Sequence, residues 1–165
     1  MQTQAFIQSR VARYYWRDDI NCATTTLKIL SEYFEVPLAD QVIDGAIGMH
    51  GAGEYGAQCG LVEGTLMFMG IVGRSRVIPD ETIIAACQDF AAAFENRFNS
   101  LSCAVLRPEG FDPENPPHLC EAFTCEAVAF TVDFVQGFLS AEGAMRAGYS
   151  PPGHHDRPSG GRTGR

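Results

Sequence analysis

The sequence has few cations and no long apolar run. Of its 165 residues, 12 are Lys or Arg and 20 are Asp or Glu, which gives a formal charge of −8, and Lys28 is the single lysine. Because phosphate contacts need a concentration of cations, this balance argues against a nucleic-acid partner. No uncharged apolar run approaches the ~18 residues of a membrane-spanning helix, and the first 19 residues lack the continuous apolar core of an export signal. We therefore expect a cytoplasmic protein with no nucleic-acid and no membrane partner.

Alternating β-strand patterns are almost absent, whereas helical periodicity runs through most of the chain. The content of 45% hydrophobic and 19% charged residues is that of a globular protein. These features predict an all-α fold, a compact single-domain bundle of about five helices with a Gly-rich loop and a Pro-rich loop. The domain is expected to cover residues 1–149. Residues 150–165 have no apolar periodicity and are expected to form a disordered tail.

Apolar stripes at helical spacing mark the expected helices. The stripes are Ile7, Val11, Tyr14 and Tyr15; Ala23, Leu27, Leu30 and Phe34 in a helix from about Asn21; and Ile83, Ile84, Cys87, Phe90, Ala91, Phe94 and Phe98 in a helix opened by Pro79 and Asp80. A further helix follows the Gly-rich stretch, and the last begins near Pro117. That last helix is apolar on two sides, which favours a central position or a homodimer interface.

The six cysteines lack every short spacing that marks a known site. They are Cys22, Cys59, Cys87, Cys103, Cys120 and Cys125. There is no C-x-x-C pair, no haem attachment site, and no zinc-ribbon or ferredoxin spacing. A reducing compartment rarely keeps structural disulfides, so thiol chemistry or metal binding is the better interpretation. Any shared site must be assembled by folding distant segments together.

Position along the expected helices divides the cysteines into two groups. Cys22, Cys59, Cys103 and Cys120 lie near helix starts. Unpaired backbone N–H groups and the positive end of the helix dipole are expected to lower the pKa of a thiol there and to favour the thiolate. The other two cysteines, at positions 87 and 125, lie on apolar stripes, where a free cysteine usually packs as a small hydrophobic residue.

Glycines surround the second of these cysteines. Gly56, Gly60 and Gly64 recur every fourth residue. On one helical turn they would form a smooth face that another backbone or a cofactor can approach closely, so they are the predicted cofactor-binding residues. The segment 51–56 also matches G-x-G-x-x-G, but no strand precedes it, so we expect no NAD site. His50 and His118 offer a mixed Cys/His site, although loop hydrogen bonding is the favoured interpretation.

Several segments together resemble a known family. These are N-C-A at 21–23, G-A-G-E-Y-G-A-Q-C-G-L-V-E-G at 51–64, S-C at 102–103, and Cys120. In order and spacing they are similar to the C_GCAxxG_C_C family of redox-active proteins, over about residues 20–135. The resemblance implies that its four cysteines are Cys22, Cys59, Cys103 and Cys120, and Leu61 stands where the family motif has alanine. It also implies an oxidoreductase or transport-system partner.

These observations leave two redox mechanisms and one non-redox role open. The four cysteines would either hold an iron-sulfur cluster, most simply [2Fe-2S], and carry single electrons, or form reversible disulfides and transfer two. The cluster is the leading cofactor hypothesis, with Cys22, Cys59, Cys103 and Cys120 as its ligands, and no haem is expected. The alternative is a structural metal-binding protein or a helical adaptor that docks on an oxidoreductase. Whether the protein is itself an enzyme is left open by the sequence.

Overall fold

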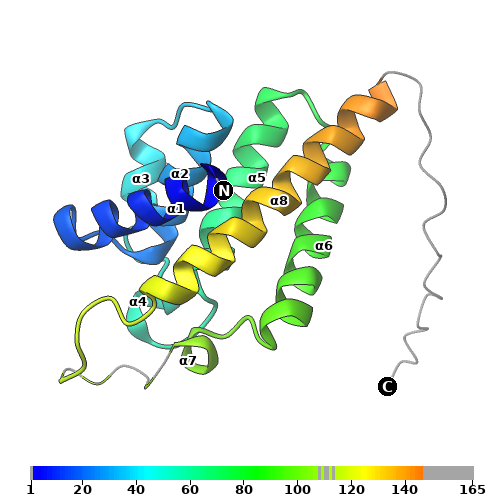
Figure 1. Ribbon diagram of the computed structural model, residues 1–165. Coiled ribbons are helices and arrows are strands. Elements are labelled where there is room, and N and C mark those ends of the chain that lie inside the picture. Colours follow the sequence, from blue (N-terminus) through cyan, green and yellow to red (C-terminus); the bar gives the residue numbers. More distant parts are fainter. Residues whose placement is uncertain (1, 108, 110–111, 113, 147–165) are drawn as a thin grey trace, which may run out of the picture.

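The fold is all-α, as predicted (Figure 1). The structure is a computed structural model that describes residues 2–107, 109, 112 and 114–146. Its elements are α1 (Gln2–Ala12), a π-helical turn η1 (Arg13–Arg17), α2 (Cys22–Phe34), α3 (Asp40–Gly45), α4 (Gly51–Glu54), α5 (Gly60–Ser75), α6 (Asp80–Phe98), α7 (Cys103–Leu106) and α8 (Glu121–Arg146). The predicted tail at 150–165 lies outside the described residues.

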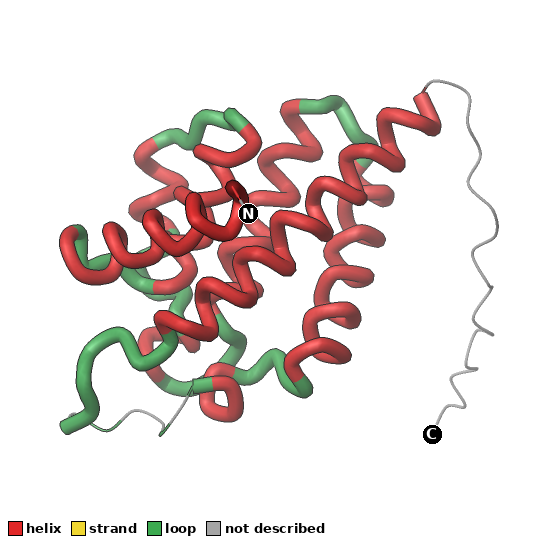
Figure 2. The backbone as a smooth tube through the Cα atoms, in the orientation of Figure 1, coloured by secondary structure: helices red, strands yellow, loops and turns green. Residues whose placement is uncertain are grey.

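Five of these helices are long, which confirms the number expected from periodicity. They are α1, α2, α5, α6 and α8. Within the described part of the chain there is no strand, and the segments between the long helices are loops and short helical turns (Figure 2). The turns α3 and α4 were not expected, because four to six residues are too few to show a 3.6-residue period. The start of α7 at Cys103 agrees with the expected helix start there.

The long helices pack around a single core. Figure 1 shows α8 crossing the molecule, with α1 and α2 to one side and α6 to the other. The most extensive helix contact joins α2 to α5, and α8 packs mainly on α1 and α5. Fully buried side chains from α1, α2, α5, α6 and α8 meet in this core, among them Ile7, Leu27, Phe68, Phe90 and Val132.

Helix α8 is also long and apolar enough to cross a membrane by length and composition alone. Within Glu121–Glu142, an 18-residue window has a mean hydropathy of 1.3, and 33% of that window is buried in the bundle. The buried side chains include Val128, Val132 and Val135, which face the core. One face of α8 is therefore a core face, in agreement with the central position expected from its two apolar stripes.

Two details of the expected helices are wrong. The last helix begins at Glu121 rather than near Pro117, because His118 takes a positive φ of 61° and the Cys120 carbonyl accepts the first helical hydrogen bond, from Thr124 N–H at 2.7 Å. Ile84 is 68% exposed although it was placed on the buried stripe of α6. The buried face of α6 is narrower than predicted and contains Ile83, Phe90 and Phe94.

Candidate redox site

Four cysteines line one cavity at the end of the bundle where several helices begin. The cavity has a volume of about 300 Å³, and Cys22, Cys59, Cys103 and Cys120 are all in its wall. Cys22 and Cys103 are the first residues of α2 and α7, Cys59 is the N-cap of α5, and Cys120 immediately precedes α8. The predicted placement at helix starts is therefore confirmed, although their redox role stays a prediction.

The start of α2 is fixed by its cap. The Asn21 side-chain oxygen accepts the Thr24 N–H at 2.9 Å, and the Asn21 amide donates to the Ile47 carbonyl at 3.0 Å and to the Ala46 carbonyl at 3.3 Å. The same side chain therefore caps α2 and ties it to the segment after α3. This arrangement holds Cys22 beside that segment.

A short backbone pairing brings together Cys59 and Cys103, which have 43 residues between them in the sequence. Gln58 and Ser102 form an isolated antiparallel bridge. Around it, Cys59 N–H donates to the Leu101 carbonyl at 2.8 Å and Cys103 N–H donates to the Ala57 carbonyl at 2.6 Å. In this register Cys59 lies opposite Leu101 and Cys103 lies opposite Ala57, so the two cysteines are diagonal neighbours across the bridge. Their side chains are hydrogen-bond partners, and this contact has the largest influence on the pKa of each thiol.

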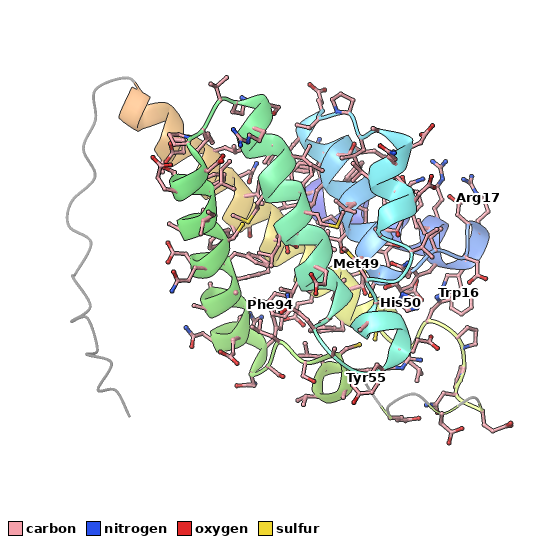
Figure 3. All side chains as sticks on the ribbon, turned by 180° about the vertical axis from the view of Figure 1, so that it is seen from behind. Trp16, Arg17, Met49, His50, Tyr55 and Phe94 are labelled. Atoms are coloured by element: carbon pink, nitrogen blue, oxygen red, sulfur yellow. The ribbon has the colours of Figure 1, made fainter. Side chains whose placement is uncertain are left out.

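The Gly-rich segment supplies the close backbone approach behind these sulfurs. Residues 51–54 form a left-handed turn with φ values from 54° to 70°. A Cβ at Gly51 would lie 2.9 Å from Cys103 Cβ and 3.0 Å from Cys103 Sγ. Glycine is therefore required at position 51 for two reasons, because φ is positive there and because Cys103 occupies the space of a Cβ. Figure 3 shows His50, the residue before this turn, near the first turns of α5.

The three glycines predicted to form one cofactor face do not share a helical turn. Gly60 and Gly64 lie on α5 against α2, where a Cβ at Gly60 would collide with Cys22 Sγ and one at Gly64 with the Ala23 carbonyl. Gly56 lies before α5 with φ of 94° and faces Ala104 of α7. Helix α2 thus occupies the space beside Gly60 and Gly64, and cofactor binding by the three glycines stays a prediction.

Burial and the hydrogen bond between Cys59 and Cys103, and not the helix dipole, decide the pKa of three of the four thiols. Burial raises the pKa of Cys22 to about 12, although backbone N–H groups at the start of α2 act in the opposite direction. Burial likewise raises the pKa of Cys120. The pKa of Cys59 is raised first by its hydrogen bond to Cys103 and then by burial. The predicted lowering is wrong for these cysteines, because desolvation of a thiolate outweighs a few backbone dipoles.

Cys103 is the exception. Its pKa is lowered to about 7, first by the hydrogen bond with Cys59, against the opposing effect of burial. The charge of Arg107 lowers it further, and Glu54 raises it by less. At neutral pH about half of Cys103 is therefore thiolate, and this thiolate accepts a hydrogen bond from the Cys59 thiol.

The comparison with known families agrees with this geometry. Residues 20–134 match the family model described as "Putative redox-active protein (C_GCAxxG_C_C)". The chain belongs to this family. The resemblance noted from the sequence is thereby confirmed, and the matched region contains all four cavity cysteines. No curated protein and no solved structure matches the chain.

In this family member the cavity lining also contains Arg107, which the sequence did not single out, and Tyr15, which periodicity assigned only to an apolar stripe. Arg107 donates a hydrogen bond to the Cys120 sulfur. It follows Cys103 by four residues, one helical turn, which is the sequence signal that was available. Tyr15 stacks on His118 with ring centroids 4.8 Å apart, and its hydroxyl and Thr124 Oγ1 lie 2.7 Å apart as hydrogen-bond partners.

The two histidines that sequence reasoning assigned to loops both line the cavity. His118 Nε2 lies 3.4 Å from Asp19 Oδ1, close enough for an ion pair when the imidazole is protonated, and its expected loop hydrogen bonding stays a prediction. His50 differs, since its Nδ1 is buried without a hydrogen-bond partner. Glu63, four residues after Cys59, is not in the cavity wall.

Cys87 and Cys125 lie outside the cavity. They are on α6 and α8, and both pack as partly buried side chains against the core. Burial raises the pKa of each thiol. Their separation from the other four confirms the division into two groups.

The fit to a metal cluster is poorer than the fit to a thiol pair. In the described residues, no group of three or more His, Cys, Asp or Glu side chains is arranged to hold a metal ion. In this conformation the cavity therefore presents a hydrogen-bonded thiol pair flanked by two further thiols.

Proposed function

We propose that this protein performs reversible thiol-disulfide exchange at Cys59 and Cys103, as a two-electron redox protein of the cytoplasm. One observation carries the proposal: the two sulfurs are already hydrogen-bonded, and the pKa of Cys103 is lowered to about 7. A thiolate is the nucleophile of disulfide exchange, and a thiol with a pKa near the ambient pH is the best attacking group.

The exchange proceeds in two displacements. The Cys103 thiolate attacks one sulfur of a substrate disulfide, a new S–S bond forms, and the other substrate half leaves as a thiolate. Cys59 then attacks Cys103 Sγ and displaces the substrate half bound there. The proton of the Cys59 thiol passes to that half, which leaves as a thiol. The substrate disulfide is reduced to two thiols, and the Cys59 and Cys103 pair is oxidised to a disulfide.

The backbone pairing at 57–59 and 101–103 holds both cysteines on one structural unit. In its antiparallel register Cys59 lies opposite Leu101 and Cys103 opposite Ala57, so the two cysteines are diagonal neighbours. Diagonal neighbours have Cα atoms roughly 7–8 Å apart, beyond the roughly 4.4 to 6.8 Å of a disulfide, so closing the S–S bond requires a local backbone shift at this pairing. Cys22 and Cys120 stay protonated at neutral pH and do not take part in the first displacement.

Serine substitutions test the assignment. Cys59→Ser and Cys103→Ser are each expected to abolish the disulfide that forms in the wild type after mild oxidation, read out by peptide mass spectrometry and by the midpoint potential. Cys87→Ser and Cys125→Ser are the matched controls and are expected to leave both readouts unchanged. A disulfide that survives in the Cys59→Ser variant, or equal loss in all four, would overturn the proposal.

A cluster held by all four cysteines is the competing outcome, and the observation that favours it is their common cavity. Anaerobic purification decides between the two. Iron and acid-labile sulfide that are lost in each of the single serine variants of Cys22, Cys59, Cys103 and Cys120 would replace the thiol-disulfide proposal. A colourless, iron-free protein that resists reconstitution and cycles between dithiol and disulfide would support it.

A further inference from the structure

A second hollow lies between α6 and α8, at a different place from the four cysteines. It is a groove with a volume of about 660 Å³, and no residue of its wall is shared with the cysteine cavity. In Figure 1 the later half of α8 passes beside the first half of α6 there. The groove therefore offers a surface that the proposed thiol exchange does not use.

The groove arises from a change in side-chain size along the two helices. The rings of Phe90 on α6 and Phe134 on α8 lie 5.2 Å apart between their centroids and fill the space between the helices. Towards the start of α6 and the end of α8 the groove is lined by small residues instead, which are Ala85, Ala86, Gly137 and Ala141. A Cβ at Gly137 would meet no neighbouring atom within 4 Å. Because both helices pack on α5 and their small residues do not bridge the gap, the space between them stays open.

Helix α8 also carries more apolar surface than the bundle covers. Only 33% of its apolar 18-residue window is buried, and Phe138, in the groove wall, is only partly buried. An exposed apolar surface of this kind marks an interaction site, and a groove between helices accepts the apolar face of an amphipathic helix. From Glu81 to Asp89 the α6 wall spans eight residues, or about 12 Å at 1.5 Å per residue, so it matches about two turns of a partner helix.

The charged residues of the groove are all acidic. Its wall contains no Lys, Arg or His and four carboxylates, which are Glu81, Asp89, Asp133 and Glu142. None of the four pairs with a side chain that the structure describes. Elsewhere on the same two helices a carboxylate is paired, since Glu126 of α8 binds Arg97 of α6 at 2.6 Å. A complementary partner therefore needs cations beside its apolar face.

We propose that the groove between α6 and α8 binds a cationic amphipathic helix of another protein. Its apolar side chains lie on Phe134, Gly137 and Phe138, and its Lys or Arg side chains lie beside the four carboxylates. A second copy of this chain fits poorly, because a symmetric contact sets the acidic wall against itself. Residues 147–165 of the chain contain three arginines but a single large apolar side chain, Tyr149, which is too little to fill the groove.

A synthetic helix of about 18 residues is the probe, with leucine along one face, lysine on both flanks and alanine elsewhere. One control peptide has glutamate in place of lysine, and the other has the same composition with its leucines spread around the helix. Affinity for the full-length protein is measured by isothermal titration calorimetry at physiological ionic strength. We expect the probe to bind about tenfold or more tightly than either control. No binding of the probe, or equal binding of the spread peptide through the protein's overall charge of −8, would overturn the proposal.

Two leucine substitutions on α8 locate the binding site. Gly137→Leu places a side chain in the groove, where its Cβ has open space, and is expected to weaken binding of the probe about tenfold or more. Ser140→Leu adds the same side chain at an exposed position of α8 outside the groove wall and is expected to leave the affinity unchanged. An unchanged affinity in folded Gly137→Leu would overturn the proposal.

A pair of charge variants tests the acidic wall separately. The double variant Asp89→Asn and Asp133→Asn removes one carboxylate from each helix and is expected to weaken binding about two- to twentyfold. Asp40→Asn with Asp44→Asn makes the same change of charge on α3, outside the groove, and is expected to change the affinity by less than about twofold. Equal affinities of the two double variants would overturn the proposal. If Gly137→Leu does not fold, as judged by circular dichroism, this comparison decides alone.

Two other occupants of the groove would give different results, and we expect neither. A dimer in analytical ultracentrifugation that Gly137→Leu dissociates would assign the groove to a second copy and overturn the proposal. Flotation with phosphatidylcholine vesicles that Gly137→Leu abolishes would assign it to a bilayer and overturn it as well. Neither result bears on the proposed thiol exchange, since the groove and the cysteine cavity have no wall residue in common.

Discussion

The six cysteines divide between two regions built in different ways. The cavity region contains Cys22, Cys59, Cys103 and Cys120, and the region between α6 and α8 contains Cys87 and Cys125. All six are free thiols. What separates them is the backbone around them, since the first group lies at helix starts and in loops and the second lies inside regular helices. The cysteines that can take part in chemistry are therefore those at irregular parts of the backbone.

The region between α6 and α8 is held by aromatic side chains. Phe90, Phe94, Phe98 and Phe130 form a chain of ring contacts with centroid distances from 4.6 to 6.2 Å. Such contacts depend on large buried areas and tilted ring geometry, and no single one of them is decisive. Stability in this region comes from apolar burial.

The cavity region depends instead on individual backbone contacts. Positive φ angles occur at Gly51, Ala52, Gly53 and Glu54, two of which are not glycine. Backbone in this region of φ costs free energy unless the surroundings hold it in place. The bonds from Gly53 N–H to the Gly48 carbonyl, at 2.9 Å, and from Glu54 N–H to the His50 carbonyl, at 3.0 Å, do so. This half of the molecule is therefore more specific in geometry and less tolerant of small changes.

The largest effect on stability is expected from Phe94→Ala. Phe94 is fully buried, and its ring contacts four other phenylalanine rings, those of Phe90, Phe98, Phe123 and Phe130. Removing a buried phenylalanine side chain costs about 3–5 kcal/mol, measured by chemical denaturation. The folded fraction is expected to keep the Cys103 reactivity of the wild type, because the ring is outside the cavity. A lowered thiolate reactivity in folded Phe94→Ala would show that the two regions are coupled.

A pair of glycines on α5 sharpens the contrast within one helix. A Cβ at Gly60 would collide with Cys22 Sγ and lie 2.9 Å from the Met49 carbonyl, whereas one at Gly70 meets nothing within 4 Å. Gly60→Ala is expected to destabilise the protein by about 1–3 kcal/mol through overpacking. Gly70→Ala is expected to stabilise it by about 0.5–1 kcal/mol through helix propensity.

Thermal unfolding of both variants and alkylation of Cys22 provide the measurements. In Gly60→Ala the Cys22 sulfur must move, so its alkylation rate should change, and in Gly70→Ala it should not. Equal stability of the two variants would mean that α2 does not lie against α5 as closely as the structure has it.

The two regions also differ in how far the sequence predicts them. Helix α6 follows from the spacing of Ile83, Phe90 and Phe94, because regular periodicity is a local property. The common site of four cysteines came from the resemblance to a family. The pairing of Cys59 with Cys103 depends on a bridge between residues 58 and 102, which no local pattern shows. The predicted lowering of the thiol pKa was wrong at three cysteines, because a sequence shows where a cysteine lies along a helix but not how deeply its sulfur is buried.

The hydrogen bond between the paired thiols is tested by a pH profile. The thiolate is the reactive form, so alkylation of Cys103 in the wild type should rise with pH and level off above about 7, where its lowered pKa lies. Below that pKa the rate should fall about tenfold per pH unit. Cys59→Ala removes the donor and is expected to move the profile to higher pH. Cys125→Ala should leave it in place, and an unmoved profile in Cys59→Ala would assign the low pKa to Arg107 alone.

The smallest effect is expected at Asn21, where two functions of one side chain can be separated. Asn21→Ser keeps an oxygen to cap α2 at Thr24 N–H but loses the amide that donates to the Ala46 and Ile47 carbonyls, and Asn21→Ala loses both. Loss of an N-cap costs about 0.5–2 kcal/mol, and a partly buried hydrogen bond contributes about 0.5–1.5 kcal/mol. We therefore expect Asn21→Ala to be less stable than Asn21→Ser, and Asn21→Ser less stable than the wild type, in denaturant unfolding. If Asn21→Ser is as stable as the wild type, the hydrogen bonds from the Asn21 amide to the segment after α3 contribute nothing to stability. The cap of α2 alone would then position Cys22.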